Sequence, residues 1–312
     1  MRSPPYSEEH VAFRETVERF VEREIIDHID SWEAAKSFPR DLYRKAADIG
    51  LLAIGFPEEL GGIPGDSFHM IVATDALAAA GSGGLIAGLL SHGIGLPPIV
   101  ALGDKALVQR IAPAVLRGDK ISALAITEPS GGSDVARLRT TAVRDGDHYV
   151  VNGSKTFITS GLRADYLTTA VRTGDEGMSG ISILAIEGDT DGITRTPLEK
   201  MGWWCSDTAL IHFEDCRVPV ENRVGDENAG FLGLMVNFNR ERLMLAAMAW
   251  AFSKVCLAEA LDWAQQRETF GRPLFNRQVI RHKLVDMQTR ISAVEALLEQ
   301  TASQIDAGEQ PV

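Results

Sequence analysis

The sequence predicts an α+β fold in three parts: an N-terminal helical domain, a middle antiparallel β-domain and a C-terminal helical domain. Residues 1–120 and 226–312 carry apolar side chains at helical spacing, whereas residues 121–225 hold short apolar runs bounded by turn signals. No helical pattern of about 10–15 residues separates those runs, which disfavours a parallel sheet of βαβ units. We therefore place the domain boundaries near residues 120 and 225.

The first domain is expected to consist of several helices. Apolar residues recur at helical spacing from Val11 to Ile25, with Glu and Arg between them, and Phe38-Pro39 ends this pattern. Gly118, a residue type typical of helix C-termini, closes the last expected helix. The further helices expected before it are Asp41–Leu52, Ser67–Ala80, Leu85–Leu102 and Lys105–Arg117.

The middle domain is expected to be a small antiparallel sheet. Asp145-Gly146-Asp147 is a hairpin turn signal between two short β-prone runs. The expected strands are Ile121–Ile126, Thr140–Val143, His148–Val151, Tyr166–Val171, Ile181–Ile186 and Ala209–Phe213.

The third domain is expected to contain two long helices, Asn239–Arg267 and Gln278–Ile305, separated by Gly271-Arg272-Pro273. The sequence ends soon after the second helix, at Val312, so we expect an incomplete helical bundle.

Composition and missing motifs exclude several functions. The net charge of −12 argues against a nucleic-acid partner. Three cysteines without a CxxC pair fit a reducing compartment, and we expect a cytoplasmic protein. The longest apolar run, near Ala76–Leu90, is too short and rich in glycine for a confident membrane span. There is no GxGxxG, phosphate-binding P-loop, GxSxG or HExxH motif, and no metal site is expected.

Two stretches resemble the acyl-CoA dehydrogenase family. The first is Ala123-Leu-Ala-Ile-Thr-Glu-Pro-Ser-Gly-Gly-Ser-Asp134, followed by Val151-Asn-Gly-Ser-Lys-Thr-Phe-Ile-Thr-Ser-Gly161. The second is Arg267-Glu-Thr-Phe-Gly-Arg-Pro-Leu-Phe-Asn-Arg-Gln278. Shorter similarities, at Pro57–Gly62 and Lys200–Thr208, occur in the same order as in the family, so the resemblance covers essentially the whole chain.

This resemblance implies a fold and an activity. Members of the family have a helical, a β and a second helical domain, and they bind FAD. They oxidise acyl-CoA thioesters to trans-2-enoyl-CoA, pass the electrons to an electron-transferring flavoprotein, and usually form homotetramers built as dimers of dimers. Family members continue with further helices, so the resemblance implies that this chain is truncated at its C-terminus.

The first stretch supplies half of the cofactor-binding residues that the resemblance implies. Ser133 matches a position that contacts both the FAD pyrophosphate and the acyl-CoA, and the small residues before it would let the backbone approach a phosphate. The alternatives are a surface turn around Pro129, and a core Phe and a surface Thr on the following strand. The flavin-binding positions are Leu124, Ile126, Thr127, Phe157 and Thr159.

The second stretch matches positions that reach the FAD of a partner subunit. Arginine suits a pyrophosphate because its guanidinium is always charged and can form two parallel hydrogen bonds. The alternative for Arg267 is a cation at a helix C-terminus. The matching residues are Arg267, Thr269, Phe270, Leu274, Arg277 and Gln278.

Glu241 is the candidate catalytic base. It matches the position of the base in the isovaleryl and long-chain branches of the family, and Phe238, Asn239 and Arg242 match positions that border the acyl-CoA. We expect Asn239 to cap the helix, which would place Glu241 in its first turn on an apolar stripe. In the alternative, Glu241 only stabilises a helix N-terminus or pairs with Arg242, and the base lies beyond Val312.

Other functions compatible with the same sequence are an acyl-CoA oxidase or a flavin monooxygenase of the same fold. A third possibility is a folded FAD-binding scaffold that is catalytically incomplete.

Overall fold

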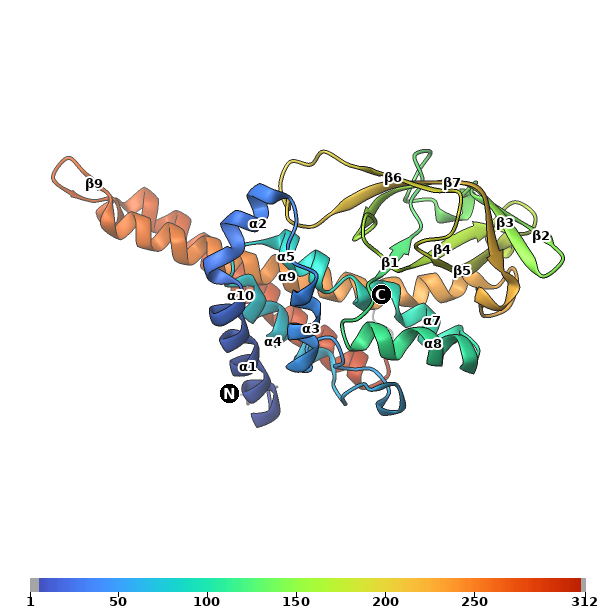
Figure 1. Ribbon diagram of the computed structural model, residues 1–312. Coiled ribbons are helices and arrows are strands. Elements are labelled where there is room, and N and C mark those ends of the chain that lie inside the picture. The colour runs from blue at the N-terminus through green and yellow to red at the C-terminus, as the bar shows by residue number, and fades with distance from the viewer. Residues whose placement is uncertain (1–5, 310–312) are drawn as a thin grey trace. The chain divides into compact units, whose positions relative to one another are not determined.

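The computed structural model describes residues 6–309, apart from the side chain of Val236. This part of the chain divides into two compact units, and each is described by itself. The β-unit comprises residues 28–64 and 84–241, and the helical unit comprises residues 6–27, 65–83 and 242–309. Most elements of both units are labelled in Figure 1.

The β-unit is built on an 8-stranded sheet with the order β6-β7-β3-β2-β4-β5-β8, in which β1 also pairs with β4. Most neighbouring strands are antiparallel, as expected, but β1 runs parallel to β4, and β2 meets β4 in parallel at Thr141 and Arg172. The strands are β1 Ser122–Ala125, β2 Thr141–Asp145, β3 His148–Thr159, β4 Tyr166–Arg172, β5 Ile181–Glu187, β6 Ile193–Pro197, β7 Thr208–Pro219 and β8 Arg223–Val224.

Strands β6 and β8 were not predicted, because their sequences lack an apolar run. Strand β6 reads Ile-Thr-Arg-Thr-Pro and has no fully buried residue, and β8 is only 2 residues long. Pairing with β7 and β5, which only the tertiary structure supplies, holds them extended. The predicted hairpin between β2 and β3 is confirmed, with Gly146 at a φ of +62° in the turn.

The helices of the β-unit differ from expectation in three places: the helix expected over Asp41–Leu52 ends at Asp48, a short helix over Ile29–Ala35 was not expected, and a third expected helix is interrupted. The single helix expected over Leu85–Leu102 is divided into three, and Pro97 separates the second from the third because it lacks the backbone N–H that a continuous helix needs. Gly95 allows α6 to lie against β1, since a Cβ there would come within 2.7 Å of Ser122 Oγ. The helices are α2 Ile29–Ala35, α3 Asp41–Asp48, α5 Gly83–Leu89, α6 His92–Gly95, α7 Pro97–Leu102 and α8 Lys105–Leu116.

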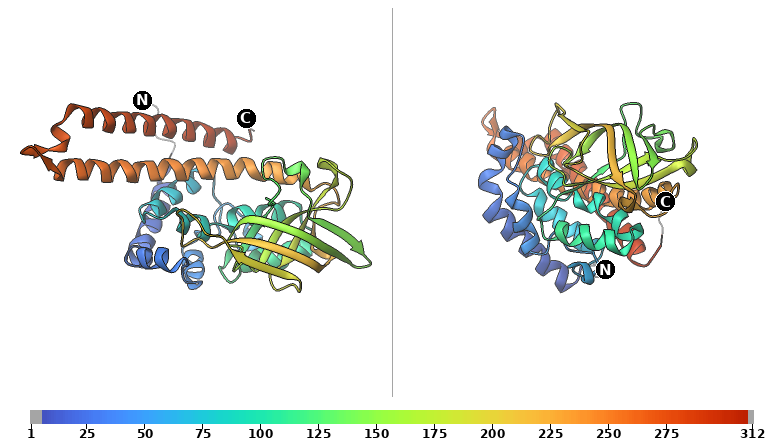
Figure 2. Two further views of the ribbon diagram at one scale, coloured as in Figure 1. Left: turned by 90° about the horizontal axis from the view of Figure 1, so that it is seen from above. Right: turned by 45° about the vertical axis from the view of Figure 1, so that its right-hand side comes forward.

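The helical unit contains α1 Glu8–Glu24, α4 Ser67–Ala78, α10 Gln278–Asp306 and the larger part of α9 Gly230–Gln266. Helices α9 and α10 run in opposite directions and are joined by a small turn (Figure 2). The buried carboxylate of Asp75 on α4 fixes α1 and α9 to that helix, because it pairs with Arg14 at 2.8 Å and with Lys254 at 2.7 Å.

Helix α9 begins at Gly230 and not at Asn239, so the predicted N-cap is wrong. Length and apolar composition alone would let α9 cross a membrane, but the core helix of a soluble protein meets the same criteria. The early start extends α9 into the β-unit, where Leu234 is fully buried in the core and Asn237 donates to the Ile94 carbonyl at 3.1 Å.

Candidate active site

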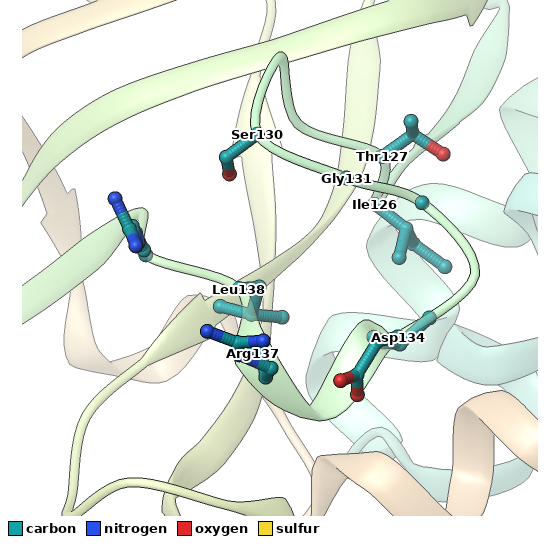
Figure 3. A pocket seen from close by; sticks show the side chains of 10 residues that line it. Ile126, Thr127, Ser130, Gly131, Asp134, Arg137 and Leu138 are labelled. Atoms are coloured by element: carbon teal, nitrogen blue, oxygen red, sulfur yellow. The ribbon is translucent and has the colours of Figure 1, made fainter.

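The loop that follows β1 surrounds a cavity of about 140 Å³ (Figure 3). Strand β1 ends at Ala125, and the chain then runs through the glycine-rich segment to Arg139. The lining residues are Ile126, Thr127, Ser130, Gly131, Gly132, Asp134, Val135, Arg137, Leu138 and Arg139. The cavity therefore joins a hydrophobic floor to a rim that carries hydroxyl and charged groups.

Two glycines shape the rim of this cavity. A Cβ on Gly132 would lie 3.0 Å from Cγ2 of Thr127, so the loop backbone passes directly against the Thr127 side chain. A Cβ on Gly131 would meet nothing within 4 Å, which leaves its backbone open to a ligand. Ser133 is exposed and lies between Gly132 and Asp134, which line the cavity, although Ser133 itself does not.

Strand β3 brings an exposed aromatic ring to this region. The backbone N–H of Thr156 donates to the carbonyl of Thr127 at 2.8 Å, and the register with β7 shifts between Lys155 and Ile158. Phe157 lies in that bulge with a φ of +61°, a strained conformation for a residue with a Cβ, and its side chain is 69% exposed. Thr159 ends the strand opposite Thr208 and is half-buried. An exposed Phe on a strained bulge is a feature of a binding surface.

Leu124 and Phe238 share one hydrophobic core with Ile126. Both are partly buried, and both pack against the cluster that contains Ile126 and Leu138 beneath the loop. Leu124 comes from β1 and Phe238 from α9, so these two predicted site residues pack against one core cluster, which also contains the cavity-lining Ile126 and Leu138.

Glu241 lies within α9, more than three turns after the helix begins. Its side chain is half-buried and the carboxylate oxygen Oε2 is buried. Because the helix N-terminus is distant, the helix dipole does not act on this carboxylate as predicted.

The neighbours of Glu241 on α9 differ in burial. Asn239 and Arg242 are exposed. The predicted apolar stripe is only partly buried, since Met248 is buried but Leu245 is 45% exposed.

The second predicted set of residues lies in the helical unit, in the connection between α9 and α10. A short pair of strands, β9 Glu268–Thr269 and β10 Arg272–Pro273, forms a turn with Phe270 96% exposed at its tip. Arg277 braces the turn, because its guanidinium donates to the Thr269 carbonyl at 2.6 Å and lies 5.5 Å from the Phe270 ring centroid.

The remaining predicted residues of this set stay near the turn. The Leu274 N–H donates to the carbonyl of Arg267 at 2.8 Å, while the side chains of Arg267 and Gln278 are exposed. The turn thus presents polar and aromatic groups to its surroundings.

Sequence reasoning missed five charged residues at the cavity, beginning with Asp134, which lines it. Arg137 and Arg139 line it, and Lys155 forms a buried ion pair with Glu128 at 2.9 Å beneath it. Burial alone would raise the pKa of Glu128, but Lys155 and the donors of Thr140 outweigh burial and hold that pKa below its usual value. The sequence carries no local signal of the burial of this pair, because Glu128 lies between Thr127 and Pro129 and Lys155 lies between Ser154 and Thr156.

One group of potential metal ligands lies within the described residues, in the helical unit: His10, Asp66 and His69. Nδ1 of His10 accepts a hydrogen bond from the Ser7 backbone N–H at 2.9 Å, so Nε2 carries the proton and donates to Asp66 at 2.9 Å. The carboxylate also accepts the His69 N–H at the start of α4 at 3.0 Å. The group is therefore explained as a helix cap, and a protonated Nε2 is unsuited to a metal.

Comparison with known proteins supports the resemblance along the whole chain. The acyl-CoA dehydrogenase N-terminal, middle and C-terminal domain families match residues 7–119, 123–216 and 228–311. An acyl-CoA dehydrogenase of Alternaria alternata is 36% identical over 94% of this chain and 72% of its own length. The long-chain specific mitochondrial enzyme of Sus scrofa is 35% identical over 94% of this chain and 69% of its own length.

The fold agrees equally well with solved structures. A protein of Mycobacterium abscessus described as a probable acyl CoA dehydrogenase superposes with a TM-score of 0.95 at 49% identity, covering 97% of this chain and 81% of that one. This chain and its relatives thus share the order of a helical, a β and a second helical domain. The chain is a member of the acyl-CoA dehydrogenase family of oxidoreductases.

Proposed function

We propose that this chain binds FAD and removes two hydrogens from an acyl-CoA thioester, giving a trans-2-enoyl-CoA. The carrying observation is the cavity after β1, which an apolar floor, an open glycine backbone and two arginines line, while β3, hydrogen-bonded to this loop, carries the exposed Phe157. A flat aromatic cofactor that ends in a pyrophosphate has matching chemistry. A solved acyl-CoA dehydrogenase from Bacillus anthracis, 29% identical to this chain, is a complex with FAD.

The residues around the cavity would hold the cofactor in distinct ways. Ile126 and Leu124 offer apolar contact to the ring system, and the Thr127 hydroxyl and Thr159 offer hydrogen bonds to its polar edge. Phe157 would cover the ring, which would remove apolar surface from water. Ser133 and the backbone near Gly131 would contact the pyrophosphate. FAD, when bound, supplies the acceptor for a hydride from the β-carbon of the substrate.

We propose that Glu241 removes the α-proton of the thioester. The Glu241 carboxylate can accept a proton, and burial of its Oε2 keeps bulk water away from that oxygen. Phe238, Asn239 and Arg242 on the same helix would border the acyl-CoA, with Phe238 contributing apolar surface. The proton on the α-carbon moves to a Glu241 oxygen as the hydride leaves the β-carbon.

The names of relatives do not narrow the acyl chain. They include long-chain specific and isobutyryl-CoA dehydrogenases among curated proteins and a butyryl-CoA dehydrogenase among solved structures. The proposal therefore extends to acyl-CoA thioesters as a class and to a place in fatty acid metabolism.

We further propose an electron-transferring flavoprotein as the electron acceptor and a homo-oligomer as the working form. A chain from a structural study of the electron transferring flavoprotein of Acidaminococcus fermentans is 31% identical, with a TM-score of 0.94. The exposed Phe270 and Arg267 at the α9–α10 turn would meet the FAD of a second copy. Three free cysteines suit a reducing cytoplasm.

Anaerobic mixing of the FAD-loaded chain with acyl-CoA thioesters of several lengths tests the activity. We expect at least one of them to bleach the absorbance band of the oxidised flavin at about 450 nm. When an electron-transferring flavoprotein is then added, the electrons should pass to it. A flavin that stays oxidised with straight and branched acyl-CoA of every length would refute the proposal. Rapid peroxide formation in air would indicate an oxidase instead.

A further inference from the structure

The loop that lines the cavity is closed by a single carboxylate. Glu128 lies at the start of the loop, and its two oxygens accept the backbone N–H groups at the end of the loop, from Arg139 at 2.7 Å and Thr140 at 2.8 Å. These donors are 11 and 12 residues along the chain from Glu128. The carboxylate therefore joins the two ends of the loop while the lining residues lie between them.

A fully buried lysine fixes this carboxylate to the sheet. Lys155 on β3 is 0% exposed, and its ammonium donates to the Glu128 carboxylate at 2.9 Å and to the Ile126 carbonyl at 3.0 Å. The next residue along β3, Thr156, donates its N–H to the Thr127 carbonyl at 2.8 Å. Consecutive carbonyls at the end of β1 are thus held by consecutive residues of β3, which also carries Phe157.

A second cation holds the far side of the loop. Arg172, at the end of β4, donates to the carbonyl of Ala136 at 2.7 Å and to that of Leu138 at 2.9 Å. These two carbonyls belong to the segment that presents Arg137 to the cavity. The loop is therefore fixed at both ends and in its second half by side chains that do not line the cavity.

Burying the ion pair of Glu128 and Lys155 costs solvation free energy, so stability of the fold alone does not explain it. Removing two charges from water is expensive, and a well-packed apolar pair of similar volume is often as stable. Apart from their bond to each other, Lys155 and Glu128 form their hydrogen bonds with backbone groups of one loop. The pair therefore stabilises the conformation of that loop. Glu128 remains ionised at neutral pH because its donors lower its pKa.

We propose that Glu128, Lys155 and Arg172 act together as positioning residues that preform the ligand-binding loop, residues 129–138, before FAD binds. None of the three contacts the cofactor in this scheme. They act through the backbone, by holding Thr127, the Gly131 backbone and Arg137 in place. A preformed loop binds more tightly because less conformational entropy is lost on binding. The proposal relies on the proposed function only for the identity of the ligand.

Hydrogen–deuterium exchange on the cofactor-free chain tests the shape of the loop directly. In Glu128→Gln and Lys155→Met, amides of residues 129–140 should exchange roughly tenfold faster or more, as expected when a buried polar group loses its partner. Helix α8 of the same unit serves as the internal reference, because none of the three substituted residues lies on it. Arg172→Met is a milder variant, and it decides the question if the other two fail to fold.

Asp207→Asn is the matched control. Like Glu128, Asp207 is buried and forms an ion pair within the β-unit, in its case with Arg163 at 2.7 Å. Its carboxylate accepts the backbone N–H of Leu162 and no group of the loop. It should lower the melting temperature to a comparable degree while leaving exchange in residues 129–140 unchanged.

Flavin titration completes the test. The dissociation constant for FAD should rise roughly tenfold in Glu128→Gln, in keeping with one lost buried interaction, and stay within about twofold in Asp207→Asn. Faster exchange spread evenly over the β-unit, or an unchanged FAD dissociation constant in Glu128→Gln, would overturn the inference. A wild-type chain that binds no FAD contradicts the proposed function, and exchange in the loop then decides the positioning role alone.

Discussion

At the scale of single residues, the position of Glu241 along its helix determines which groups surround its carboxylate. The sequence placed it in a first helical turn, where the helix dipole would stabilise the carboxylate. The structure places it inside α9, half-buried with one oxygen buried. The helix terminus therefore does not act on this carboxylate, and burial keeps bulk water away from its Oε2.

Glu241→Gln keeps the size of the side chain and removes its basicity. Flavin reduction by acyl-CoA should slow by roughly 10²–10⁴-fold, the usual range for a positioned base, with little change in FAD binding. Anaerobic stopped-flow absorbance measures this rate. Glu259→Gln, an exposed position of the same helix, is the control and should behave as wild type. A loss below about tenfold would assign the proton transfer to another group.

His92 is a buried imidazole with a consequence for acid stability. Burial lowers its pKa from 6.5 to about 4, although its Nε2 lies 3.0 Å from the Leu52 carbonyl. Between pH 6.5 and pH 4 the unfolded chain binds a proton at this site that the folded chain does not. Stability should therefore fall as the pH is lowered through this window.

The size of that effect can be measured by chemical denaturation across the pH range. His92 should contribute a loss of roughly 3 kcal/mol in unfolding free energy between the two pKa values, at about 1.4 kcal/mol per pKa unit. His92→Gln should remove this component and flatten the profile in that window. A variant with the same slope as wild type would mean that other groups control the acid sensitivity.

At the scale of elements, the α9–α10 turn has features that its own unit does not explain. Phe270 is almost fully exposed and has a φ of +53°, and the guanidinium of Arg277 braces the turn around it. An exposed aromatic costs solvation free energy, which a partner would recover on contact. This supports a role toward FAD in a second copy of the chain.

Arg267→Ala tests that role. FAD affinity should fall by about tenfold or more, since a charge-assisted hydrogen bond to a phosphate contributes on the order of 1.5–3 kcal/mol. Flavin fluorescence during titration gives the affinity, and light scattering gives the oligomeric state in the same samples. Arg281→Ala, an exposed arginine on α10, is the control. Equal FAD affinity in both variants would remove Arg267 from the site.

At the scale of the whole molecule, FAD binding should stabilise the fold. A ligand that binds only the folded state at 100 times its dissociation constant adds about 2.7 kcal/mol to the unfolding free energy. We expect FAD to raise the melting temperature in a concentration-dependent way. Riboflavin, which lacks the pyrophosphate, should stabilise less. Absence of any FAD-dependent shift would contradict a site for this cofactor in the chain.

Much of the organisation of this protein follows from the sequence by itself. Strong local patterns determine the order of helical, β and helical segments, the β2–β3 hairpin and helices α4, α8 and α10, because apolar period and turn residues act over short distances. The quoted motifs likewise identify the family, and the comparisons agree.

Only the tertiary structure decided the features that depend on distant partners. Strand β6 has no apolar run and is extended because β7 pairs with it. Helix α9 starts at Gly230 because residues of its first turns, such as Leu234, are buried in the hydrophobic core. Glu128 and Lys155 read as ordinary charges in sequence, and their role emerges only when β3 lies against the end of β1, since a buried ion pair requires both partners in place.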